Sequence, residues 1–305
     1  MRLSASGQPA MTGAALMIGA GAGFACVNTL LQYVTMMLGV SAPTATFWQY
    51  FIALLVLLPW QGIGLKGFAT ARPGAHLLRV AFAVGGVQLW TLGLAHVPIW
   101  QAIALIMLSP FFVTAGAGLL LREEVTPARW IAVLTGFVGG AVILSPWSDG
   151  FTLWAFAPIG AAALWAAASL MTKRMTATES PETLTLYLLA LLTPLNLGLA
   201  LMPEAGGLAI ASAPAIAALV VAGLLTALAQ YALARAYATA DAAFLQPFDH
   251  VKLAFNVGLG ALVFGFVPPG SMWLGSALIV GASLWLLARE RRGIGHRLTR
   301  ERAGG

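Results

Sequence analysis

Long apolar segments recur along nearly the whole of this 305-residue chain, and no other feature limits its fold as strongly. A helix needs about 20 mostly apolar residues to cross the roughly 30 Å of hydrocarbon in a bilayer. Ten segments reach about that length, and only 9% of all residues are charged. We therefore predict an all-α, polytopic membrane protein with ten transmembrane helices. The predicted spans are residues 11–37, 42–61, 74–96, 98–121, 128–147, 152–172, 182–202, 212–235, 240–265 and 270–288.

Basic residues lie at alternate connections between these spans. Lys and Arg that flank a span resist translocation and mark its cytoplasmic side. The even-numbered connections carry such residues, with Arg79 and Lys173 among them, whereas the odd-numbered connections contain none. Both termini, residues 1–10 and the basic tail 289–305, are therefore expected in the cytoplasm. The net charge of +6 then reflects topology and contact with anionic lipid, so it requires no nucleic-acid partner.

The chain divides near Ser148 into two halves of five spans each, residues 11–147 and 152–288. An odd number of spans per half makes the two halves enter the membrane in opposite directions. Residues 108–140 also resemble residues 245–283, because each stretch has Pro-Phe inside a span, a Gly-rich end, a Pro-bearing turn and a Trp. We therefore predict two inverted five-helix repeats, with a substrate site near the bilayer midplane between them.

Four segments carry a resemblance to a known family. They are ALIMLSPFFV and LLLREEVTPARWIAVLTGFVGG in the first half, and RAYATADAAFLQPFD and LVFGFVPPGSMWLGSALI in the second. Through them, residues 11–288 resemble the EamA branch of the drug/metabolite transporter superfamily. The resemblance implies ten helices, cytoplasmic termini and solute transport by alternating access. Members that look like this chain include exporters of amino acids and other metabolites, and uptake carriers for S-adenosylmethionine.

Amides replace charges at several positions of the family pattern. The family often has Asp and Lys in the first helix, where this chain has Asn28 and Gln32, and Arg in the second, where it has Gln49. The Gly-Glu pair that often ends the ninth helix is Gly265-Phe266 here. The coupling roles that relatives give to those charges are therefore not carried over to this chain.

Uncharged hydrogen-bonding side chains predominate inside the spans. A polar group in hydrocarbon needs a partner, so each one either makes an interhelical hydrogen bond or lines a wet pathway. Both interpretations stay open for any single residue. Together these side chains predict a polar, largely neutral cavity, with Asn28, Gln88, Gln101 and Gln230 as substrate-binding candidates.

The ninth span has a polar face near the bilayer midplane. At 100° per residue, Gln246, Asp249, His250 and Lys252 fall within an arc of roughly 160°. Asp249 and Lys252 are one turn apart and can pair, which lowers the cost of holding either charge away from water. We predict that this face lines the transport pathway. The alternative is a buried ion pair that only fixes the helix.

One tryptophan lies far from the membrane interfaces, where tryptophans usually gather. Trp165 is near the middle of the sixth span, among alanines. We predict that its indole forms part of the cavity wall or stacks on a substrate, with plain core packing as the alternative.

The sequence contains no Walker, HExxH or GxSxG motif, and its four histidines are scattered. We therefore expect no cofactor and no metal, and a membrane-embedded enzyme is the less favoured class. The leading prediction is a secondary transporter of a bacterial inner membrane that exports small polar solutes, above all amino acids. A zwitterion would replace each partner of the Asp249–Lys252 pair in turn. The alternative is a proton-coupled uptake carrier for S-adenosylmethionine, a vitamin or a nucleoside-like metabolite. The partners required are a small molecule and membrane lipid, and a monomer suffices.

Overall fold

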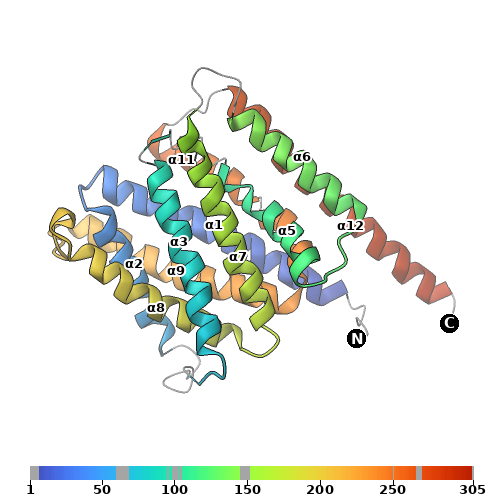
Figure 1. Cartoon of the computed structure of the whole chain (residues 1–305), viewed down its shortest axis with the longest axis horizontal. Helices are drawn as coiled ribbons and strands as arrows, with labels where there is room; N and C mark the ends of the chain where they lie inside the picture. The colour runs from blue at the N-terminus through green and yellow to red at the C-terminus, as the bar shows by residue number, and fades with distance from the viewer. Residues whose placement is uncertain are drawn as a thin grey trace.

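The computed structural model shows a bundle of helices (Figure 1). It describes residues 7–59, 69–94, 96–97, 102, 105–144, 152–249, 251–265 and 270–303. Every regular element within these residues is helical. The α-helices are α1 (Gly7–Met36), α2 (Ala42–Leu57), α3 (Pro73–Leu94), α5 (Ser109–Leu120), α6 (Pro127–Leu144), α7 (Phe156–Met175), α8 (Pro181–Ala200), α9 (Ala213–Thr239), α10 (Ala242–Asp249), α11 (Val251–Phe264) and α12 (Gly270–Ala303). Short 3₁₀ turns at Leu153–Ala155 and Pro203–Ala205 precede α7 and α9.

These helices confirm the predicted all-α polytopic architecture with ten spans. Among the residues that the structure describes, four helical segments, within α1, α7, α8 and α9, are long and apolar enough to cross a membrane. Shorter apolar stretches lie in α2, α5, α6 and α12. Helix α12 also continues through the basic tail as far as Ala303, well beyond the predicted end of the tenth span at residue 288.

The fourth span is divided, which the sequence did not predict. Helix α5 begins at Ser109, after a turn at Met107 and Leu108, and Pro110 lies in its first turn, where the missing N–H costs no helical hydrogen bond. In the ninth span the structure describes α10 and α11 on either side of residue 250, which lies outside the described residues. One continuous helix over residues 240–265 therefore stays a prediction.

The packing of the helices shows the inverted repeat. Helix α1 packs against α9 and α11, and its counterpart in the second half, α7, packs against α3 and α5. If each helix is replaced by its counterpart in the other half, the contacts of α1 become the contacts of α7. The pairs α2 with α8 and α6 with α12 join counterparts directly, and Figure 1 shows α6 and α12 side by side at the edge of the bundle. We call α1, α9 and α11 the α1 group, and α3, α5 and α7 the α7 group.

Several helices begin at a serine followed closely by proline. The side chains of Ser41, Ser180 and Ser212 accept hydrogen bonds from the first turns of α2, α8 and α9. These caps satisfy backbone N–H groups that have no partner inside the helix, and proline tolerates the first turn.

The two ends of the bundle differ in charge. Basic residues lie in or beside the connections before α3 (Arg72), between α5 and α6 (Arg122 and Arg129) and between α7 and α8 (Lys173 and Arg174), and we call this side the basic end. At the other side the hydroxyl of Thr44 donates to the carbonyl of Gly207 (2.6 Å), and the indole of Trp48 donates to that of Leu208 (3.0 Å). These bonds tie the start of α2 to the connection between α8 and α9.

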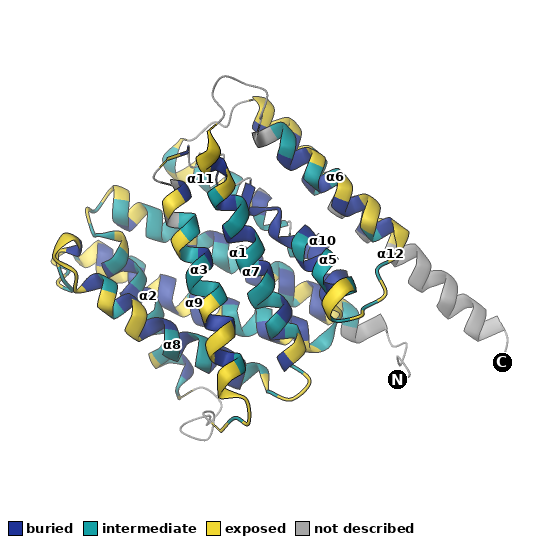
Figure 2. Cartoon of the chain, in the orientation of Figure 1, coloured by how far each residue is buried: buried dark blue, intermediate teal, exposed yellow. Residues whose placement is uncertain are grey.

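The outer surfaces of the peripheral helices are apolar. Leu134 and Val138 of α6, and Leu274 and Leu284 of α12, are more than half exposed, and Figure 2 shows exposed faces along both helices. Large exposed apolar side chains in such number are expected where a protein surface contacts lipid.

Candidate functional site

A cavity of about 420 Å³ lies between the α1 group and the α7 group, with α2, α8 and α10 completing its wall. Its volume falls in the range of roughly 300–1,000 Å³ typical of small-molecule sites. Five aromatic and five amide side chains contribute to the lining, together with three charged ones. The aromatic residues are Phe24, Tyr50, Trp90, Trp165 and Tyr237; the amides are Asn28, Gln49, Gln230, Gln246 and Asn256; the charged residues are Arg79, Asp249 and Lys252.

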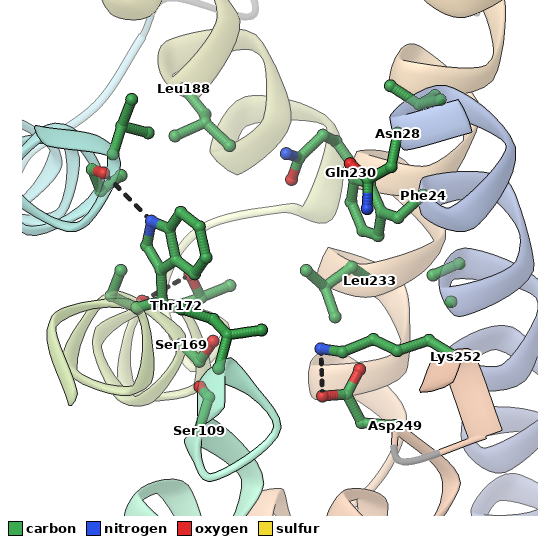
Figure 3. Close-up of a pocket in the computed structure, with 18 of the residues that line it drawn as sticks. Phe24, Asn28, Ser109, Ser169, Thr172, Leu188, Gln230, Leu233, Asp249 and Lys252 are labelled. Atoms are coloured by element: carbon green, nitrogen blue, oxygen red, sulfur yellow. Dashed lines mark hydrogen bonds and ion pairs between the residues drawn. The ribbon is translucent and has the colours of Figure 1, made fainter. Parts of the chain in front are cut away.

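The ion pair predicted on the ninth span is formed between the end of α10 and the start of α11. Lys252 Nζ lies 2.6 Å from Asp249 Oδ2, and the two side chains are 22% and 17% exposed. Figure 3 shows the pair on one side of the pocket, with Ser109, Ser169 and Thr172 on the other. Gly21 of α1 leaves room for Lys252, because a Cβ atom there would lie 3.1 Å from the Cβ of the lysine.

Most amides of the cavity are already bonded to the protein. Asn28 Nδ2 donates to Asn256 Oδ1 (3.2 Å), which joins α1 to α11, and Asn256 Nδ2 donates to the carbonyl of Lys252 (2.8 Å). Gln49 Nε2 donates to the Thr226 hydroxyl (2.9 Å), and Gln246 Nε2 donates to a carbonyl of its own helix. Two of these bonds, from Asn28 and Gln49, join neighbouring helices, and the other two stay within one helix.

Gln230 of α9 differs from these amides. It lines the cavity and makes no side-chain hydrogen bond with the residues that the structure describes. Figure 3 shows its amide in the pocket near Phe24 and Asn28. Its donor and acceptor are therefore available to a solute.

Trp165 of α7 lies on the opposite wall. Its indole Nε1 donates to the carbonyl of Ala83 in α3 (3.1 Å), and its ring centroid lies 6.2 Å from that of Trp90. Gly86 makes this position possible, since a Cβ atom there would lie 2.5 Å from the indole. The ring is thus fixed against α3 and presents a surface to the cavity.

Arg79 is the charged wall residue that the sequence reasoning did not select. Its side chain is 3% exposed, its Nη1 donates to the Thr172 hydroxyl of α7 (3.1 Å), and its Nη2 donates to the carbonyl of Leu184 in α8. No ion pair among the described residues includes it. The sequence predicts Arg79 beside a cytoplasmic connection. In the structure it lies with Ala83, Val87 and Trp90 on the face of α3 that lines the cavity.

The remaining candidates from the sequence lie elsewhere. Gln88 is exposed and points away from the face of α3 that lines the cavity, so the structure does not bring it to the site. Gln101 and His250 lie outside the described residues. Within the described part of the chain, no group of three or more His, Cys, Asp or Glu residues is placed to hold a metal ion.

The basic end below the cavity is filled by a buried core and two charged contacts. Met17, Phe248 and neighbouring apolar side chains form the core. The carboxylate of Glu123 accepts hydrogen bonds from the backbone N–H groups of Ala242 and Ala243, both at 3.0 Å. Lys173 Nζ donates to two carbonyls at the end of α9, at 3.0 and 2.6 Å. Both charged groups thus bind the turn between α9 and α10. The positive Lys173 lies at the end of α9 and the negative Glu123 at the start of α10, which is the arrangement that the helix dipoles favour.

Inverted helical repeats that enclose a partly polar cavity define a multi-pass membrane transporter of small molecules. Comparison with known proteins agrees and is more specific. Residues 11–145 match the EamA-like transporter family. A riboflavin transporter of Rhizobium johnstonii is 51% identical over 93% of this chain and 93% of its own length, and one of Vibrio cholerae is 50% identical over 88% and 91%. The chain therefore belongs to the EamA-like transporter family, and it is a transporter of small metabolites and not an enzyme.

More distant matches include a transporter with another substrate in its name, and a solved structure with the same fold. An S-adenosylmethionine uptake transporter of Rickettsia prowazekii is 26% identical over 81% of this chain and 83% of its own length. A crystal structure that is 18% identical superimposes with a TM-score of 0.68, covering 89% of this chain and 98% of that chain. At such low identity this second likeness supports the fold alone.

Proposed function

We propose that the protein carries riboflavin across the bacterial inner membrane by alternating access. Relatives that carry the name riboflavin transporter are 45–51% identical over 88–93% of this chain. This level of identity over nearly the full length is the observation on which the proposal chiefly depends.

The lining of the cavity fits such a substrate. Riboflavin joins a flat aromatic isoalloxazine ring to a flexible chain of hydroxyl groups. Phe24 comes from the α1 group and Trp165 from the α7 group, so each side of the cavity offers an aromatic surface. Aromatic rings stack on flat heterocycles, and the amide and hydroxyl groups between them can bind the polar chain.

The charge of the cavity favours riboflavin over S-adenosylmethionine. Arg79 and Lys252 are positive and Asp249 is negative, so the charged lining residues leave one positive charge in excess. S-adenosylmethionine carries a sulfonium cation and would be repelled, whereas riboflavin is neutral. Amino-acid export stays a prediction from the Asp249–Lys252 pair, and the names of the relatives do not support it.

Flux into proteoliposomes that contain the purified protein tests the proposal. We expect saturable movement of riboflavin, measured by flavin fluorescence, and exchange of labelled against unlabelled riboflavin. Excess S-adenosylmethionine or mixed amino acids should leave this flux unchanged. Saturable amino-acid flux without riboflavin flux would contradict the proposal and restore the prediction from charge.

We also propose that the basic end is cytoplasmic, because Lys and Arg flanking a span are retained on that side. In a Cys26→Ala background, Ala177→Cys marks the basic end and Glu204→Cys marks the opposite end, and both native residues are exposed. A membrane-impermeant maleimide should label Glu204→Cys in intact cells and Ala177→Cys only after lysis. The reverse pattern would invert the topology.

A further inference from the structure

The five amides that line the cavity fall into two classes. The NH₂ groups of Asn28, Gln49, Gln246 and Asn256 each donate to a protein acceptor. Gln230 makes no side-chain hydrogen bond with the residues that the structure describes. Gln230 is half-buried and faces the cavity, so its amide can bind water or a solute there.

A carboxamide has a donor and an acceptor side by side, which determines what it can recognise. One chemical complement is an imide edge, in which a ring N–H lies next to a carbonyl group. The carboxamide oxygen accepts the N–H, and its NH₂ group donates to the carbonyl, so two hydrogen bonds form at once. The isoalloxazine ring has such an edge at N3–H and its flanking carbonyls, whereas the hydroxyl chain at N10 lies at the other side of the ring.

We propose that Gln230 is a specificity-determining residue that binds the imide edge of the flavin ring, its Oε1 accepting N3–H and its Nε2 donating to a neighbouring carbonyl. This assignment rests on the proposed riboflavin transport. It orients the substrate, because the edge bound at α9 fixes where the ring and the hydroxyl chain can lie. Phe24 is next to Gln230 in the pocket and is placed to stack on a ring held in this way (Figure 3).

Two charged lining residues are less suited to this role. The guanidinium of Arg79 already donates to Thr172 and Leu184, and a guanidinium has no acceptor for N3–H. The ammonium of Lys252 is bound to Asp249. Among the described amides of the lining, Gln230 is the one whose side chain makes no hydrogen bond to a described protein group.

The test compares riboflavin with 3-methylriboflavin, in which a methyl group replaces the N3 hydrogen. Affinities are measured by quenching of flavin fluorescence with the purified protein, with Gln230→Met, and with Gln88→Met as the matched control. Gln88 lies outside the cavity and is exposed, so its substitution changes an amide without touching the site.

We expect the parent and Gln88→Met to bind the methyl analogue about tenfold or more weakly than riboflavin, since two hydrogen bonds are lost. Gln230→Met should bind riboflavin about tenfold more weakly than the parent and should no longer distinguish the two flavins. Loss of discrimination in this variant alone is the signature of direct contact.

Three outcomes would overturn the assignment. If the unsubstituted protein binds both flavins equally, it does not recognise the imide edge. This measurement does not depend on the folding of any variant. Gln230→Met that discriminates as the parent does would place the imide edge elsewhere. A parent that binds neither flavin would overturn the proposed function and this assignment with it. Gln230→Leu replaces the methionine variant if that variant folds poorly.

Discussion

The wall that α7 brings to the cavity differs from the wall formed by α10 and α11. The residues of α7 that line the cavity, Trp165, Ser169 and Thr172, carry no charge. Those of α10 and α11 include the paired charges of Asp249 and Lys252 (Figure 3). The two halves build one symmetric frame of helices and fill it with different side chains. A solute bound between such walls meets a different chemistry on each side, so it is held in one orientation.

The aligned repeats show where this asymmetry arises. Aligning Ile18-Gly19 with Ile159-Gly160 sets Phe24 against Trp165, and both rings line the cavity. Aligning the two Pro-Phe pairs instead sets Phe112 against Asp249. Aromatic character is therefore common to both halves, and the ion pair belongs to the second half alone.

Removing one charge of the pair should have the largest effect. Asp249→Asn leaves the ammonium of Lys252 without its carboxylate, which costs about 1–3 kcal/mol of stability and should reduce riboflavin flux at least tenfold. Asp249→Asn combined with Lys252→Met removes both charges, and thermal unfolding in detergent should return close to the parent value. Flux should stay low in the double variant, because the pair lines the pathway. Parent-like flux would instead make the pair a structural feature.

Removing the indole of the opposite wall should have the next largest effect. Trp165→Ala deletes a ring surface and its hydrogen bond to Ala83, and loss of one stacking contact is worth about 1–3 kcal/mol, or about 5-fold to 150-fold in affinity. Trp154→Ala is the matched control, since Trp154 is 47% exposed and stacks on His96 outside the cavity lining.

Gly86→Ala tests the position of the indole without changing the tryptophan itself. Its Cβ atom would lie 2.5 Å from the Trp165 ring, so the indole must move, and flavin affinity should fall. Gly19→Ala is a glycine control, because a Cβ atom at that position meets nothing within 4 Å. If Gly86→Ala and Trp165→Ala both bound riboflavin as the parent does, the aromatic wall would have no part in recognition.

The sequence predicted the fold well because the length of an apolar run depends on local composition alone. It did not predict the division of the fourth span. Pro110 is compatible with a kink inside one helix or with the start of a new one, and tertiary packing decides between them. The periodicity over the ninth span still placed Gln246, Asp249 and Lys252 on one face, and all three line the cavity.

The sequence was less informative about single residues on α3. Both Arg79 and Gln88 lie in this helix, and composition favoured the amide as a cavity residue and the arginine as a cytoplasmic flank. The structure has Arg79 buried and Gln88 exposed. The side of a helix that faces a cavity depends on its neighbours, which a uniformly apolar span does not reveal.

Weakening the contact between the repeats at the basic end should have a smaller effect. The carboxylate of Glu123, from the first half, binds the start of α10 in the second half. The corresponding turn of the second half has the sequence Gly265-Phe266 and contains no carboxylate. Glu123→Gln keeps one acceptor and loses the charge, so we expect a loss of about 1 kcal/mol. Glu124→Gln, at the exposed neighbouring residue, should leave the unfolding temperature unchanged. Equal shifts in both variants would show that overall charge, and not the cap, is responsible.

The smallest expected effect comes from the residues that end α5 and α11. Arg122 and Gly265 adopt the same left-handed backbone, with φ of 55° and 65°, so the halves share this turn with different residues. Gly265→Ala meets no atom within 4 Å, so its cost should be the backbone strain of about 1 kcal/mol less the entropy that alanine removes from the unfolded chain. Arg122→Gly relieves the same strain but frees the unfolded chain, so it should raise stability by less than about 1 kcal/mol. Unfolding temperatures in detergent measure both changes, and a stabilising Gly265→Ala would show that the two turns are not equivalent.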